Sequence, residues 1–429
     1  MFQPYQDKEI YSPFSNLNIL IEHIENILRS FQIEPKPLDR IVDSYFKHHT
    51  NIGSKDRRFI SNITFGIIRW KRRLEDILAY AKIKPTIKRV VAIYILWEHE
   101  NSDHELLYNI LGKQIDFDID TAKLSDENAV FYSFPDFMYR IFEQVKGKDL
   151  ASKLAVALNQ EVDITIRTNT LKIDRNSLQR KLKDEGVETI PTTYAPDGLK
   201  LNKRINFNTL ISFKEGLFEI QDEASQIAVY LVQPQSNETI LDMCAGAGGK
   251  TLAIAALSNG IPKIIASDKE KLKLTVLKNR AKRAGISNIS IINADNIIPK
   301  LEGKCDVVLV DAPCSGSGTI RRNPDLKWRL NKDVINDRTN LQKALLEKAT
   351  QLVKDNGRIV YITCSIFPQE NEEIAAWFCQ KFKWNLISAK NILKADICEK
   401  FCTSKGFFKT DPSETSLDGF FGAVFKKQL

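Results

Sequence analysis

The first 150 residues carry hydrophobic side chains at the spacing of helices. Between Leu17 and Phe31, apolar residues recur every three or four positions and therefore share one helix face. A second pattern of this kind runs from Ser54 to Trp70, and apolar runs follow at 86–97 and 105–111. No segment here alternates apolar and polar residues as a half-buried strand does. We therefore predict an all-helical domain over residues 1–150.

From residue 160 the pattern changes to short apolar segments separated by amphipathic stretches. In 160–235, strands are expected at 164–168 and 199–201 and a helix at 175–185, which together form a small α/β subdomain. In 236–429, strands are expected at 239–244, 263–268, 289–292, 306–311 and 358–363, with helices near 250–258, 269–284 and 338–354. Alternation of this kind is typical of a doubly wound parallel sheet. A Rossmann-like domain is expected there.

Composition and charge narrow the class of protein. The chain has 429 residues, of which 43% are hydrophobic and 27% charged, as in ordinary globular proteins. Its longest apolar run, Val90–Trp97, is far too short to cross a bilayer, and Met1–Tyr11 has no signal-peptide core. A cytoplasmic protein without membrane contact is expected, with a monomer favoured. The net charge of +8 suits a polyanionic partner without requiring one.

The cysteines and histidines occupy different parts of the sequence. All seven cysteines follow residue 243 and form no C-x-x-C pair, whereas all five histidines precede residue 105. Neither a disulfide framework nor a metal site is expected from this arrangement. Any chemistry in the C-terminal half must proceed without a nearby histidine, which argues against most hydrolase triads.

The segment Ile240–Thr251 has the pattern of a strand, a glycine turn and the start of a helix. It is not a P-loop, because Cys244 replaces the first glycine, and not a dinucleotide fingerprint, because Thr251 replaces the third. Asp268 ends the next strand and suits ribose hydroxyls, and Asp295 follows the third strand and suits an adenine edge. A structural turn is the alternative. The acids favour a nucleoside cofactor without phosphates, such as S-adenosylmethionine.

Two cysteines stand just beyond predicted strands, where ligands bind in such sheets. Cys314 follows the fourth strand and Cys364 the fifth. One such cysteine is commonly a small buried hydrophobic residue, but two in Ser/Gly/Pro turns favour chemistry. A thiolate that adds to carbon 6 of a pyrimidine activates carbon 5 toward a methyl sulfonium and then leaves by elimination. Asp311 is suited to hydrogen-bond cytosine at N3 and its amine. These residues alone do not rank the two cysteines.

Four motifs closely resemble the RNA cytosine-5 methyltransferases, above all the bacterial Sun/Fmu type that acts on 16S ribosomal RNA. They are Asp242–Thr251, Asp311–Thr319, Arg321–Trp328 and Thr363–Asn371. Segments 216–225 and 418–421 also match, 166–169 resembles the RNA-facing subdomain, and 54–70 resembles the attached NusB-like helical domain. The resemblance implies an α/β fold: a Rossmann-like S-adenosylmethionine-dependent methyltransferase domain, a small α/β RNA-binding subdomain and an all-helical NusB-like N-terminal domain.

The resemblance also implies roles for individual residues. Cys364 would be the attacking nucleophile and Cys314 would assist product release, with Asp311 as the third catalytic residue. The cofactor would be bound by Cys244, Ala245, Gly246, Ala247, Gly248, Gly249, Lys250, Asp268, Asp295 and Asp311. The glycine turn departs from the family's usual Ala-Pro-Gly-Gly, since it has Gly-Ala-Gly-Gly here.

RNA contacts are expected in two places. Basic and aromatic residues interleave directly after the fourth-strand motif, a pattern that suits a phosphate backbone and a stacked base. We predict RNA contacts from Arg321, Arg322 and Trp328, and by resemblance from Arg167 and Asn169. The basic helix over 269–284 is instead expected to present a solvated face.

The sequence therefore predicts S-adenosylmethionine-dependent methylation of cytosine carbon 5 in RNA, through a covalent bond between a cysteine and carbon 6. The expected substrate is 16S ribosomal RNA. Two alternatives stay open: a transfer-RNA cytosine-5 methyltransferase, and a non-catalytic RNA-binding assembly factor that kept the fold. The target nucleotide and the base that removes the carbon-5 proton are not predicted.

Overall fold

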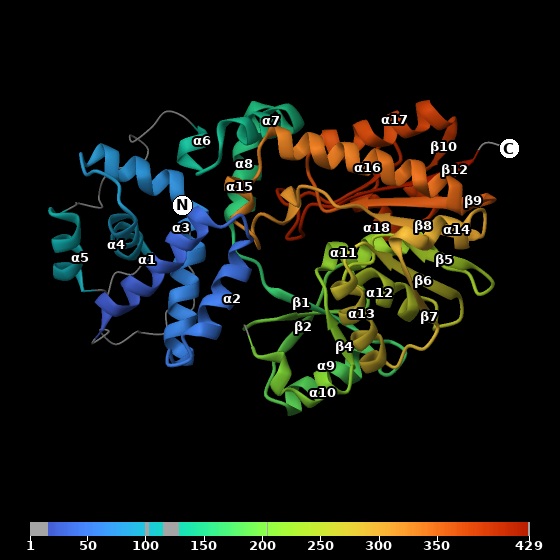
Figure 1. Ribbon diagram of the computed structural model, residues 1–429, viewed down its shortest axis with the longest axis horizontal. Helices are drawn as coiled ribbons and strands as arrows, with labels where there is room; N and C mark the ends of the chain where they lie inside the picture. Colours follow the sequence, from blue (N-terminus) through green and yellow to red (C-terminus); the bar gives the residue numbers. More distant parts are fainter. Residues whose placement is uncertain (1–15, 99–102, 115–127, 204, 428–429) are drawn as a thin grey trace. The chain divides into compact units, whose positions relative to one another are not determined.

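The computed structural model describes residues 16–98, 103–114, 128–203 and 205–427 (Figure 1). The chain divides into two compact units. The first contains residues 1–160 together with 320–329, and the second contains 161–319 and 330–429. The excursion of ten residues, 320–329, out of the second unit was not expected. The finer division at 1–150, 160–235 and 236–429 stays a prediction.

The first unit is built from helices. They are α1 (Leu17–Ile33), α2 (Leu38–His48), α3 (Ser54–Tyr80), α4 (Ile87–Glu98), α5 (His104–Leu111), α6 (Asn128–Phe131), α7 (Asp136–Lys146), α8 (Lys148–Asn159) and the short α15 (Leu326–Arg329). The apolar faces expected from the sequence make the core of α1, α3 and α4, where Ile24, Ile67 and Val91 are buried. The predicted helical N-terminal region is therefore confirmed.

The second unit contains a small antiparallel sheet in the order β2-β3-β1-β4. Its strands are β1 (Ile164–Thr168), β2 (Thr189–Pro191), β3 (Gly198–Leu201) and β4 (Phe218–Ile220), and α9 (Arg175–Asp184) and α10 (Ile211–Lys214) accompany them. Ile166, Leu178 and Phe218 lie in its separate apolar core. Strands β1 and β3 and helix α9 occur where the sequence predicted them.

The large sheet of the second unit has the order β10-β12-β9-β8-β5-β6-β7. Five neighbouring strands are parallel: β5 (Thr239–Asp242), β6 (Lys263–Asp268), β7 (Ile289–Asn293), β8 (Cys305–Asp311) and β9 (Val353–Thr363). The antiparallel edge of β10 (Trp384–Ile387), β11 (Phe408–Lys409) and β12 (Phe421–Lys427) was not predicted. The predicted Rossmann-like sheet is confirmed, and the carboxyl ends of its parallel strands lie along one edge.

Helices cover both faces of the large sheet (Figure 1). One face packs against α11 (Glu223–Ala228), α12 (Gly249–Leu257), α13 (Lys271–Ala284) and α18 (Ala395–Phe401). The other packs against α14 (Ile297–Leu301), α16 (Lys332–Leu352) and α17 (Glu372–Phe382). Successive strand residues point to opposite faces, as Val307 and Val308 do on β8. The middle of the central strand β8, Val307–Val310, is buried on both faces and is apolar throughout.

Candidate active site

The glycine turn joins β5 to α12 and has a backbone that only glycine adopts easily. Gly246 and Gly248 have φ angles of +53° and +90°. A Cβ atom on Gly248 would lie 2.6 Å from Cγ of Leu277, so the turn packs closely on α13. The amide of Gly246 donates to Oδ2 of Asp268 at 2.9 Å. The turn and the end of β6 are therefore held together as one edge of the site.

The acids at the strand ends are placed differently from one another. Asp242 is buried at 1% exposure, where its Oδ2 accepts from the Thr251 hydroxyl at 2.7 Å. Burial raises the pKa of Asp242 to about 7. Asp268 lies at the end of β6 and binds backbone amides through both oxygens, and Asp295 is exposed in the turn after β7. Asp242 is therefore buried within the protein and holds Thr251, while Asp268 and Asp295 lie at the carboxyl ends of their strands.

A lysine–aspartate pair stands at the centre of this edge. Nζ of Lys250 lies 2.7 Å from Oδ2 of Asp311, and it lies over the Phe420 ring at 5.3 Å from the centroid. Burial acts to lower the pKa of Lys250, but the neighbouring acids, Asp311 first, outweigh it and the pKa is raised. Lys250 therefore stays charged and balances the carboxylate of Asp311.

The two cysteines predicted from the sequence lie side by side. Their Sγ atoms are 3.3 Å apart, although the residues are 50 positions apart in the chain. The pKa of Cys314 is raised well above its ordinary value, first by the hydrogen bond to Cys364 and then by burial. A raised pKa favours the protonated form of Cys314, and either sulfur of the pair can be the hydrogen-bond donor. Glu370, in the 3-10 turn Pro368–Glu370, accepts hydrogen bonds from both turns that carry these cysteines. The sequence did not indicate this role, although Glu370 lies within the fifth-strand motif.

The remaining cofactor candidates lie in the glycine turn and its flanks. The amide of Ala245 donates to the Ser267 carbonyl at 2.9 Å, and the carbonyl of Ala247 accepts from Arg280 at 2.8 Å. Cys244 is half-buried, and Gly249 begins α12. The structure brings the predicted set to one edge of the sheet, and binding of a cofactor by these residues stays a prediction.

Arg167 and Asn169, predicted to contact RNA, are buried at β1. Both Nδ2 hydrogens of Asn169 are used inside the protein, by the carbonyls of Gly216 and Ala284 at 2.8 and 2.9 Å. Burial lowers the pKa of Arg167 to about 10. Asn169 thus has a structural role between the small sheet and α13, and an RNA contact by either residue stays a prediction.

Arg321, Arg322 and Trp328 belong to the helical unit. Arg321 is 2% exposed, and its carbonyl accepts from Arg69 at 3.0 Å. Nε1 of Trp328 donates to the Ile68 carbonyl at 2.6 Å, which anchors the indole on α3. Arg322 is partly exposed. These contacts give the segment a packing role that its basic, aromatic composition did not indicate, and its contact with RNA stays a prediction.

The prediction of a solvated face for the basic helix 269–284 is wrong for two of its arginines. Arg280 and Arg283 of α13 both pair with Glu219 of β4, at 2.8 and 2.6 Å. Glu219 is buried, and the two guanidinium groups balance its negative charge. The pairs tie the small sheet to the helix that supports the glycine turn.

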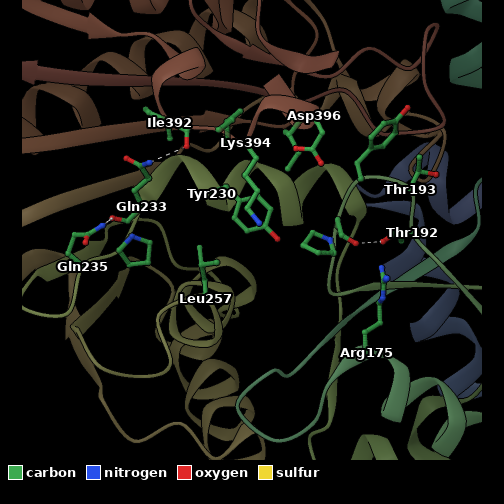
Figure 2. A pocket seen from close by; sticks show the side chains of 16 residues that line it. Arg175, Thr192, Thr193, Tyr230, Gln233, Gln235, Leu257, Ile392, Lys394 and Asp396 are labelled. Carbon is green, nitrogen blue, oxygen red and sulfur yellow. Dashed lines mark hydrogen bonds between the residues drawn. The ribbon is translucent and has the colours of Figure 1, made fainter. Parts of the chain in front are cut away.

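A cavity of about 530 Å³ lies elsewhere in the second unit (Figure 2). Arg175, Tyr194, Tyr230 and Lys394 are among its lining residues, and Gln233 closes part of it through a 3.1 Å hydrogen bond to the Ile392 carbonyl. Neither Cys314 nor Cys364 lines it. Its volume alone therefore does not make it the site of the chemistry.

The described residues contain neither a metal-binding cluster nor a helix suited to span a membrane. Within residues 16–98, 103–114, 128–203 and 205–427, no group of three or more histidine, cysteine or acidic side chains is arranged to hold a metal ion. Across those same ranges, no helix combines the length and apolar character that a bilayer crossing requires.

Two family models match the chain, one over the large sheet and one over the small sheet with the helices before it. The model described as 16S rRNA methyltransferase RsmB/F matches residues 229–426. A model of the ferredoxin-like domain of RsmF/B-like methyltransferases matches residues 134–208, which include three strands of the small sheet. The motifs that carry the cysteines and the glycine turn fall within the first match.

Relatives cover most of the chain. Ribosomal RNA small subunit methyltransferase B of Vibrio cholerae is 30% identical, over 72% of this chain and 68% of the relative. The mouse 28S rRNA (cytosine-C(5))-methyltransferase is 32% identical, over 71% of this chain and 40% of its own. A solved structure, PH0851, has a TM-score of 0.78 and 28% identity, covering 95% of this chain and 99% of its own. The resemblance inferred from the motifs is confirmed: the chain belongs to the RsmB/F family of 16S rRNA methyltransferases.

Proposed function

We propose that the protein methylates carbon 5 of cytosine in RNA with S-adenosylmethionine, and that 16S ribosomal RNA is its substrate. The observation that carries this proposal is the 3.3 Å contact between Cys314 and Cys364 beside the Lys250–Asp311 pair. Membership of the RsmB/F family supports methyl transfer. The name of the mouse relative supports cytosine carbon 5 as the position modified.

The residues at the strand ends fit S-adenosylmethionine. The left-handed turn at Gly246 and Gly248 lets backbone approach a ligand closely, and a side chain at Gly248 would already collide with Leu277. The carboxylates of Asp268 and Asp295 suit ribose hydroxyls and an adenine edge, and nothing in this set resembles a phosphate-binding loop. When bound, the cofactor supplies an electrophilic methyl group.

In this proposal Cys364 is the nucleophile. Its thiolate would add to carbon 6 of cytosine and move an electron pair to carbon 5. Carbon 5 would then take the methyl group as the methyl–sulfonium bond breaks, which leaves a neutral thioether. After the carbon-5 proton is removed, the bond between sulfur and carbon 6 breaks and the thiolate leaves. Cys314, which keeps its proton, donates to the Cys364 sulfur and stabilises the departing thiolate. The Cys364 sulfur thus both attacks and leaves, and Cys314 assists only the departure.

Asp311 orients the cytosine, and Lys250 balances negative charge. Asp311 shares one oxygen with Lys250 and keeps about a third of its side chain exposed at the edge. It is therefore suited to accept a hydrogen bond from the cytosine amine, which favours cytosine over uracil. Lys250 compensates the added negative charge close to the thiols.

The remaining functional predictions belong to the same proposal. The small sheet would bind RNA with Arg167 and Asn169 at β1, and Arg321, Arg322 and Trp328 would contribute RNA contacts. A cytoplasmic monomer that acts without a metal completes the proposal. Transfer RNA as the substrate, and a role without catalysis, are outcomes that the experiment below separates.

The test uses purified protein, S-adenosylmethionine and separate transcripts of 16S ribosomal RNA and transfer RNA, with bisulfite sequencing to locate 5-methylcytosine. We expect methylation of 16S ribosomal RNA only. Cys364→Ala should abolish turnover and form no covalent species, whereas Cys314→Ala should accumulate an enzyme–RNA adduct visible on a denaturing gel. The opposite pattern would reverse the two roles. Methylation of transfer RNA alone, or cofactor binding with no methylated RNA, would overturn the proposal.

A further inference from the structure

A buried carboxylate connects the two cysteine-bearing turns. Glu370 lies in the 3-10 turn Pro368–Glu370 and is 0% exposed. Its Oε1 accepts from the amide of Ser315 at 2.7 Å and from Nε2 of Gln342 at 3.1 Å. Its Oε2 accepts from the hydroxyls of Ser315 and Ser365 at 2.5 and 2.6 Å. One side chain therefore receives four hydrogen bonds from three elements.

The two serines that Glu370 binds directly follow the two catalytic cysteines. Ser315 follows Cys314, and Ser365 follows Cys364. A third hydroxyl extends this network, since Ser317 Oγ lies 3.0 Å from Ser365 Oγ and accepts from the Ile366 amide at 3.0 Å. An ionised carboxylate has only acceptor sites, and here every partner is a donor. Such full pairing is what allows this group to be buried.

Sheet pairing alone does not set the distance between the thiols. The ladder between β8 and β9 pairs Asp311 with Ile362 as its last register position, and each cysteine lies beyond it. Beyond the ladder, the Ala312 amide donates to the Ile362 carbonyl, and one backbone bond joins the two turns, from the Gly318 amide to the Cys364 carbonyl at 3.0 Å. Gln342 of α16 binds both Glu370 and the Pro313 carbonyl. Glu370 is thus the side chain that reaches both turns and the helix beneath them.

We infer that Glu370 is a positioning residue that sets the distance between the Cys314 and Cys364 sulfur atoms. Through this distance it sets how well Cys314 can assist the departure of the Cys364 sulfur. This inference rests on the proposed function. Glu370 acts through the serines and does not touch the reacting atoms. Its charge also contributes to the raised pKa of Cys314, which agrees with a proton held on that sulfur.

The chemistry of the carboxylate predicts different effects for two substitutions. Glu370→Ala removes all four acceptors and leaves the buried donors unpaired, so the turns should separate. Glu370→Gln keeps one oxygen for the Ser315 amide and Gln342, and its amide can donate to the two hydroxyls after they rotate. Because a displacement of about 1 Å costs on the order of 100-fold in rate, we expect kcat to fall about 100-fold in Glu370→Ala and no more than about tenfold in Glu370→Gln. KM for S-adenosylmethionine should stay within about twofold, since no hydrogen bond joins Glu370 to the glycine turn.

A second measurement reads the thiol spacing without RNA or cofactor. Phenylarsine oxide bridges two thiols only when they lie close together, and bridging removes both from titration with a thiol reagent. Cys398 and Cys402 are also hydrogen-bonded to one another, so the experiment uses a background in which both are serine. In that background we expect Cys314 and Cys364 to be bridged, Glu370→Ala to reduce the affinity for the arsenical about tenfold or more, and Glu370→Gln to restore most of it. Cys364→Ser should abolish it.

The matched control is Glu373→Ala, because Glu373 is exposed three residues along the chain. It should leave kcat and bridging unchanged. If Glu370→Ala does not fold, Ser365→Ala takes its place, because it removes one of the four donors. It should lower both kcat and the affinity for the arsenical.

Three outcomes for Glu370→Ala would overturn the inference. Bridging and kcat could both equal those of the parent protein, bridging could be unchanged while kcat falls, or bridging could be lost while kcat is unchanged. If the parent protein methylates no RNA, the proposed function fails. The arsenical measurement would still decide whether Glu370 sets the spacing.

Discussion

Nζ of Lys327 donates to the carbonyl oxygen of Arg69 at 2.9 Å across 258 positions of sequence. It also donates to the Ser133 carbonyl and to Oδ1 of Asn159, and it lies 3.8 Å from the centre of the Phe134 ring. Burial lowers the pKa of Lys327 well below its ordinary value, because a charged ammonium loses its water. The ten residues 320–329 are therefore held in the helical unit by a buried lysine.

Lys327→Met should destabilise the helical unit. Methionine fills similar space but leaves the acceptors that Lys327 satisfied without a donor, which costs about 2–4 kcal/mol. Hydrogen exchange should accelerate in peptides from α3 and α8, which contribute Arg69 and Asn159. Lys332→Met is the control, since Lys332 is exposed at the start of α16 and its loss should change exchange little. Equal exchange in the two variants would contradict the role given to Lys327.

Gly248→Ala should destabilise the second unit by two separate effects. Alanine is strained at a φ of +90°, and its Cβ would lie 2.6 Å from Cγ of Leu277. Together these should cost about 2–4 kcal/mol of unfolding free energy, measured by urea denaturation. Gly260→Ala is the matched control, because Gly260 has a φ of +70° with no atom near the added Cβ. It should lose only about 1 kcal/mol, and equal losses would show that the contact with Leu277 is unimportant.

Glu219→Gln should weaken the support of the glycine turn. The buried carboxylate holds Arg280, and Arg280 donates to the Ala247 carbonyl at 2.8 Å. Loss of the charge leaves two arginines without their partner, and we expect unfolding free energy to fall by about 2–4 kcal/mol. Calorimetric titration should also show S-adenosylmethionine binding about three- to tenfold more weakly, about 1 kcal/mol. Glu215→Gln breaks only the exposed pair with Lys181 and should be nearly neutral.

Asp242→Asn should change how stability depends on pH. In the folded protein the pKa of Asp242 is raised to about 7 by burial, so between pH 4 and 7 the folded state keeps a proton that the unfolded state releases. This acid therefore makes the parent protein less stable as pH rises through that window. Asparagine can still accept from Thr251 but cannot ionise.

The variant should match the parent at pH 4 and exceed it above pH 7 by on the order of 2–4 kcal/mol. Denaturation midpoints at pH values from 4 to 8 measure the difference. Parallel curves for the two proteins would show that Asp242 does not carry this dependence.

The order of the elements and the location of the candidate site were predictable because both are local properties. Hydrophobic periodicity reports which face of a segment is buried, and with the short apolar runs it located α1, α3, α4, α5 and the five parallel strands. It did not locate α2, α6, α7 and α8. In a parallel sheet every strand ends at the same edge, so a cysteine just after each of two strands already implies that Cys314 and Cys364 approach one another. Asp311, which ends β8, follows from the same rule, whereas Lys250 of α12 was expected at the site only from the family resemblance.

Only the tertiary structure decided which distant groups pair. The basic and aromatic residues around Trp328 have the composition of an RNA-binding loop, and nothing near them in the chain reveals that Lys327 is buried among carbonyls of the N-terminal helices. Similarly, Glu370 is charged and close to the end of a motif, yet its four donors come from segments 5 to 55 positions away. Periodicity and propensity act over a few residues, whereas burial of a charge depends on donors and acceptors that only packing brings together.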